Sequence, residues 1–70
     1  MENSADTVIG VAEAKVAYWE KETNESASVL RTQAKEGSAA HFEQALLRFT
    51  RCYQNLVDAQ TTLANLPKND

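Results

Sequence analysis

The placement of helix-breaking residues constrains the fold of this chain more than any other feature. The 70 residues contain two glycines and one proline, which are Gly10, Gly37 and Pro67. No breaker interrupts the stretches between them, so each stretch is long enough for a single helix. We therefore predict two helices, over about 5–35 and about 39–66, joined by a tight turn at about 36–38.

The residues beside the breakers predict how each helix begins and ends. Gly37 can adopt the left-handed conformation that often follows a helix, and Ser38 can cap the second helix. Pro67 cannot continue that helix and disfavours the α conformation at the residue before it. Candidates to cap the first helix are Asn3, Ser4 and Asp6. We expect residues 1–70 to form one all-α domain, an antiparallel two-helix hairpin.

Composition excludes several classes of partner and location. Seven Lys and Arg against ten Asp and Glu give a net charge of −3, which disfavours nucleic acid as a partner. A single cysteine cannot form an internal disulfide, so a reducing compartment is expected. No apolar run approaches the roughly 20 residues of a membrane span, and the start Met1-Glu2-Asn3 lacks the features of a signal peptide. We expect a cytoplasmic protein that does not insert into membranes.

The apolar residues of the first helix form a thin seam. They recur at the three- and four-residue spacing of helices that pack side by side. The members of this seam are Ile9, Ala12, Val16, Trp19, Thr23, Ala27, Leu30 and Ala34. Segment 21–26 carries no large apolar residue, so we expect about two turns of this helix to contribute little burial. A weaker second stripe, Val11, Tyr18 and Val29, points elsewhere.

The second helix carries a much broader apolar face. Its heptad stripe comprises Phe42, Leu46, Phe49, Tyr53, Leu56 and Leu63. Further apolar residues widen the stripe on both sides, namely Ala45, Cys52, Ala59 and Leu66 on one and Val57 and Ala64 on the other. At about 100° per residue these positions sweep roughly half of the helix circumference, which is more than one neighbouring helix covers.

This surplus predicts a further protein surface. Fully burying a large apolar side chain stabilises a fold by about 1.5–3 kcal/mol, whereas ordering each residue costs about 1.5 kcal/mol. A lone hairpin is therefore expected to be marginal, and a partner or dimerisation would complete it. The candidate partner-binding residues are Tyr18, Phe42, Leu46, Phe49, Tyr53, Leu56 and Leu63.

The residues that could carry chemistry favour inert roles. His41, in the first turn of the second helix, has no further ligand at metal-binding spacing. Cys52 lies on the apolar side, which predicts a buried and unreactive thiol. The cluster of Glu20, Glu22 and Glu25 is typical of a solvated face. We expect no enzyme activity, no metal and no cofactor.

The turn and second helix resemble a known family. The stretch from Lys35 to Phe42, followed by Leu46, Phe49 and the stripe of Leu56, Ala59 and Leu63, resembles the small co-chaperones of bacterial type III secretion, the YscE-like family. In that virulence-associated family the hairpin pairs with a tetratricopeptide-like chaperone, and together they keep the needle subunit soluble in the bacterial cytoplasm. The resemblance implies that Phe42, Leu46, Phe49, Tyr53 and Leu56 belong to the hairpin core or to the chaperone contact.

A second function stays open beside this one. Two hairpins could close into a self-contained four-helix bundle that acts as a regulator or an RNA-binding adaptor. Arg48 and Arg51 give the polar face of the second helix a modestly basic character. Two arginines supply few phosphate contacts, so a solvated polar face is the favoured interpretation of these residues.

Overall fold

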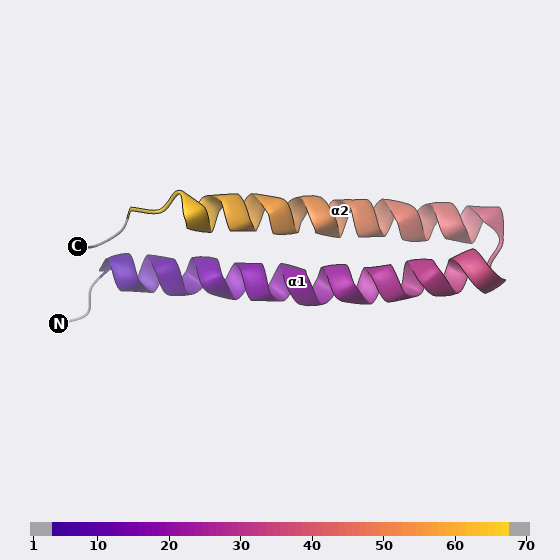
Figure 1. Cartoon of the computed structure of the whole chain (residues 1–70), viewed down its shortest axis with the longest axis horizontal. Coiled ribbons are helices and arrows are strands. Elements are labelled where there is room, and N and C mark those ends of the chain that lie inside the picture. Colours follow the sequence, from indigo (N-terminus) through magenta and orange to yellow (C-terminus); the bar gives the residue numbers. More distant parts are fainter. Residues whose placement is uncertain (1–3, 68–70) are drawn as a thin grey trace.

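The structure is an antiparallel pair of long helices, as the sequence predicts. The computed structural model describes residues 4–67. Helix α1 spans Ser4–Glu36 and helix α2 spans Ala39–Ala64, and they run side by side along the whole molecule (Figure 1). The result is a rod of 55 × 17 × 13 Å. The prediction of an all-α two-helix hairpin is confirmed, with helix bounds within about two residues of those expected.

The turn between the helices is built by Ser38 rather than by a left-handed glycine. Ser38 is extended, with φ −76° and ψ 167°, and its Oγ accepts a hydrogen bond from the backbone N of His41 at 3.3 Å. The Nδ1 atom of His41 also lies 3.2 Å from Ser38 Oγ. The predicted N-cap is thus confirmed, and His41 is exposed in the first turn of α2.

The expectation of a left-handed Gly37 is also wrong. No glycine among the described residues has a positive φ. The backbone N of Gly37 donates to the carbonyl of Gln33 at 2.9 Å, so the helical hydrogen-bonding pattern extends to this residue. The space beside it explains the glycine, because a Cβ here would lie 3.0 Å from the Gln33 carbonyl oxygen and would collide with the Gln33 side-chain amide.

The outer helix ends lie close to where the sequence places them. Helix α2 ends at Ala64, and Asn65 caps it with its backbone N directed at the carbonyls of Thr61 and Thr62, at 3.0 and 3.2 Å. It stops two residues before the predicted end, with Asn65 as its C-cap. Asp6 lies inside α1 and does not cap it. The alternative cap Asn3 lies outside the described residues.

Replacing Gly10 by alanine should stabilise the hairpin. Gly10 lies inside α1, and a Cβ at this position would meet nothing within 4 Å. Alanine in a helix interior is favoured over glycine by about 1 kcal/mol, which corresponds to a rise of about 4–8 °C in Tm. Thermal unfolding followed by circular dichroism measures the effect. The control Gly37→Ala should gain less because of Gln33, and an equal or larger gain there would contradict this assignment.

The seam between the helices is made of small side chains. Its fully or nearly fully buried members are Ala12, Thr23, Ser26, Ala45 and Cys52. Ser26 is 0% exposed, and its Oγ donates to the carbonyl of Thr23 at 2.9 Å. The prediction that segment 21–26 contributes little burial is therefore wrong, because two of its short polar side chains lie buried in the seam. Ala34 is exposed, and the half-buried Gln33 occupies the seam instead.

The hairpin leaves an unusually large part of its surface uncovered. Among the side chains that the structure describes, the buried apolar ones are alanines and a cysteine, and every larger one keeps contact with solvent. A compact protein of this mass, 7.7 kDa, is expected to expose about 4,300 Å², whereas this chain exposes 5431 Å². Two helices close one seam between them but enclose no three-dimensional core.

Candidate functional site

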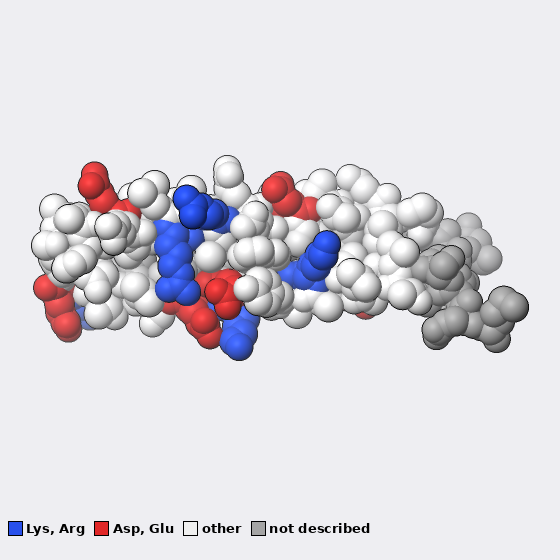
Figure 2. Space-filling view, turned by 180° about the vertical axis from the view of Figure 1, so that it is seen from behind, with Lys and Arg blue, Asp and Glu red and all other residues white. Residues whose placement is uncertain are grey.

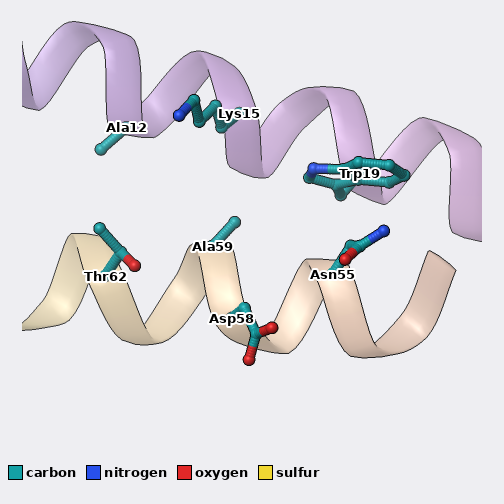
Figure 3. Close-up of a pocket in the computed structure, with 7 residues that line it drawn as sticks. All are labelled: Ala12, Lys15, Trp19, Asn55, Asp58, Ala59 and Thr62. Carbon is teal, nitrogen blue, oxygen red and sulfur yellow. The ribbon is translucent and has the colours of Figure 1, made fainter. Parts of the chain in front are cut away.

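The first side of the hairpin is polar and holds a shallow groove. On this side, Arg48 Nη2 of α2 lies 3.8 Å from Glu22 Oε1 of α1. Toward the termini a groove of about 220 Å³ opens between the same flanks of the two helices (Figure 3). Its lining residues are Ala12, Lys15, Trp19, Asn55, Asp58, Ala59 and Thr62.

This groove offers mixed chemistry without a defined ligand. Ala12 lies opposite Thr62, and Trp19 lies opposite Asn55, so the groove crosses from helix to helix (Figure 3). Seen from behind, the rod shows Lys and Arg interspersed with Asp and Glu (Figure 2). Interspersed charges of both signs give no extended positive surface for a phosphate backbone on this face. Within the described part of the chain, no group of three or more His, Cys, Asp or Glu residues could hold a metal ion.

The opposite side of α2 carries an exposed apolar band, which we define as Leu46, Tyr53 and Val57. These side chains are 42%, 52% and 40% exposed. At about 100° per residue they lie roughly a quarter turn around α2 from the buried Ala45. The ring of Tyr53 stacks on that of Phe49, with centroids 6.1 Å apart and planes at 19°. The α2 band is thus a continuous aliphatic and aromatic strip beside the hairpin seam.

The α2 band is also free of charge. The charged residues of α2 between Ala45 and Ala64 are Arg48, Arg51 and Asp58, and all three lie on the groove side or the outer side of the helix. Thr50 and Gln60 flank the band, and Asp58 borders it on the outer side, where it shares a shallow surface pocket with Tyr53 and Val57. A water-exposed apolar strip without charges is the kind of surface that another protein covers.

The structure divides the predicted partner-binding residues into two groups. Leu46 and Tyr53 are exposed and belong to the α2 band. Four others are half-buried against α1 and serve the hairpin, namely Phe42, Phe49, Leu56 and Leu63. Tyr18 is 55% exposed, but it lies on the groove side, where its ring meets that of Trp19 edge-on at 4.9 Å. The structure therefore does not bring Tyr18 together with the α2 band.

Two exposed large apolar residues of α2 were not among the predicted site residues. Val57 follows Tyr53 by four residues, so helical spacing could have placed it in the band. Leu47, at 64% exposed, lies on the outer side of α2, away from both α1 and the band. No periodic pattern includes Leu47, so sequence spacing gave no reason to select it.

The single cysteine is covered within its own chain. Cys52 is buried between α1 and α2. This confirms the predicted buried thiol, and no second chain is needed to cover it. In the described residues, neither helix is long and apolar enough to cross a membrane. Comparisons of the chain with protein-family models, with curated proteins and with solved structures find no match.

Proposed function

We propose that this chain is a protein-binding module that docks on a larger helical protein through the α2 band. The observation that carries the proposal is the position of Leu46, Tyr53 and Val57, which are exposed on a hairpin whose fully buried side chains are all small. An amphipathic helix that lays such a strip into an apolar groove is a common mode of protein recognition. Binding would stabilise both partners by mass action.

Burial of the α2 band would contribute favourable free energy to this contact. Each large side chain contributes about 1.5–3 kcal/mol on full burial, and each member of the band has roughly half of its surface still to bury. The half-buried Phe42 and Phe49 beside the band would lose further contact with water. Tyr53 is suited to a central position, because its ring is large and its hydroxyl can hydrogen-bond at an interface.

For the identity of the partner we propose a tetratricopeptide-like chaperone of bacterial type III secretion. The support is the resemblance of the turn at Gly37 and Ser38, and of α2, to the YscE-like co-chaperones. In this role the chain would act in the cytoplasm, where the chaperone complex keeps the needle subunit soluble. Stacked helix pairs present concave surfaces, and a straight rod with an apolar strip is complementary to such a surface.

The RNA-binding alternative has less support. Arg48, one of the two arginines on which it depends, lies within 4 Å of Glu22 in the same chain. A phosphate would have to compete with the Glu22 carboxylate for Arg48. On the polar face of α2, this leaves Arg51 as the other of the two arginines. We therefore do not propose nucleic-acid binding.

Co-expression tests the proposed function. The chain would be produced with the tetratricopeptide-like chaperone and the needle subunit encoded in the same genome, with an affinity tag on the chaperone. We expect the chain to co-purify in a stoichiometric complex that survives size exclusion. Separate elution of the chain in the presence of correctly folded chaperone would overturn the assignment.

A further inference from the structure

The side of the hairpin that carries the α2 band extends onto α1. Because Arg48, Asn55 and Glu22 mark the groove side, helical geometry places the opposite flank of α1 beside the band. This flank comprises the half-buried Ile9, Val16 and Ala27 and the exposed Glu13, Glu20 and Arg31. Glu20 and Arg31 are eleven residues apart, which is about three turns, so they lie on the same stripe of α1.

We propose that a second copy of this chain covers the α2 band in the absence of a docking partner. The two hairpins would stack face to face about a two-fold axis, with α1 against α1 and α2 against α2, both antiparallel, to form a four-helix bundle. The inference rests on the same surface as the proposed function and adds a competing, self-associated state that protects this surface.

One register matches the apolar residues of α2 with one another. In a two-fold antiparallel pair centred between Phe49 and Thr50, Leu46 faces Tyr53 of the second copy, and Phe42 faces its Val57. Phe49 then lies beside its own counterpart near the axis. Every member of the band meets an apolar side chain in this register, and no charged residue of α2 enters the contact.

The same axis matches the charges of α1. Within the hairpin, Ala12 lies opposite Thr62 and Trp19 lies opposite Asn55 (Figure 3). The point between Phe49 and Thr50 on α2 is therefore level, within about one residue, with segment 25–26 of α1. About that centre, Glu20 of each copy faces Arg31 of the other. The two-fold symmetry makes this pair twice, at the rim of the contact, where it sets register more than affinity.

Other arrangements of two hairpins are disfavoured by the same charges. If the two copies of α1 overlapped along their full length, the two-fold axis would pass near Glu20. The Glu20 carboxylate of one copy would then face that of the other. A parallel stack, with both turns at the same end, would place Glu20 and Arg31 against the uncharged band of the other copy's α2. Desolvated charges without partners are costly, so the shifted antiparallel register is favoured.

The available area fits a dimer. The hairpin exposes 5431 Å², which is about 1,000 Å² more than a compact protein of its mass. A stable interface of standard size buries about 800 Å² per partner. The stacked arrangement would also direct Phe42, Phe49 and Leu56 toward the centre of the bundle and supply the core that a single hairpin lacks.

Charge reversal tests the register. Sedimentation equilibrium should show the wild-type chain as a dimer at tens of micromolar. Glu20→Arg or Arg31→Glu alone should weaken dimerisation by about tenfold, because each creates two like-charge contacts. The double variant Glu20→Arg, Arg31→Glu should restore it to within about threefold, and the off-interface control Arg51→Glu should leave it unchanged. A monomer at 200 µM or a double variant without recovery would overturn the inference.

A distance measurement tests the orientation. In a Cys52→Ala background, a spin label at Ala40→Cys lies near the turn, and the antiparallel register places the two labels about 30 Å apart. A separation below about 20 Å would indicate the parallel stack and would overturn the proposed arrangement. A monomeric chain that still binds the chaperone would reject this inference alone. A dimer that binds no chaperone would reject the proposed function alone.

Discussion

Replacing Tyr53 by glutamate should abolish capture of the chain by the proposed partner, a tetratricopeptide-like chaperone. Tyr53 lies at the centre of the α2 band, and any partner that covers the band must bury this position. A carboxylate buried there without a partner costs several kcal/mol. We expect affinity to fall by at least about a hundredfold, measured as co-purification with the tagged chaperone and by titration calorimetry.

Leu47 provides the matched control for this variant. It lies on the same helix and is 64% exposed, compared with 52% for Tyr53, but it lies on the outer side of α2. Leu47→Glu adds the same negative charge and should leave capture within about threefold of wild type. Circular dichroism at 200 µM should show both variants as helical, and Tyr53→Glu alone should lose helix sooner on dilution, because Tyr53 also lies in the proposed contact between two copies. Equal binding by the two variants would place the docking surface elsewhere.

Replacing Ser26 by leucine should largely unfold the hairpin. Ser26 is 0% exposed in the seam between α1 and α2, which also includes the buried Ala45 and Cys52. A leucine would force the helices apart or adopt a strained rotamer, and overpacking of this kind costs about 1–3 kcal/mol. Chains of this size have a total stability of only about 3–5 kcal/mol, so most of it would be lost.

The same substitution two residues later separates packing from helix propensity. Ser28 is exposed on α1, and leucine is a better helix former than serine. Ser28→Leu should therefore be neutral or slightly stabilising, whereas Ser26→Leu should lower the urea midpoint markedly at an unchanged slope. Equal midpoints for the two variants would show that the close helix contact at Ser26 does not exist in solution.

The fold could be predicted because its determinants are local. Gly37 and Ser38 fix the turn, and the absence of other breakers allows two long helices. Their packing could not be predicted in the same way. The apolar spacing placed Thr23 in the seam, but Ser26 is polar and small and was not predicted there, although it is 0% exposed between the helices. Side-chain size decides how closely two helices pack, and the spacing of apolar residues does not report this distance.

The candidate site could be predicted only in outline. The heptad stripe of α2 correctly indicated more apolar surface than α1 covers. It could not separate Phe49, which faces α1, from Tyr53, which faces solvent, because the two lie only about 40° apart on the helix. That separation depends on the direction from which α1 packs, and Arg48 with Glu22 reveals this direction only in the folded chain.

Thermal unfolding of the purified chain at several concentrations tests most directly whether the hairpin needs a second protein surface. If another copy covers the α2 band, Tm should rise by about 5–10 °C between 2 and 200 µM, and helicity should decline on dilution. A Tm that stays high and constant over this range, with monomeric sedimentation throughout, would show that two helices suffice and would contradict the account.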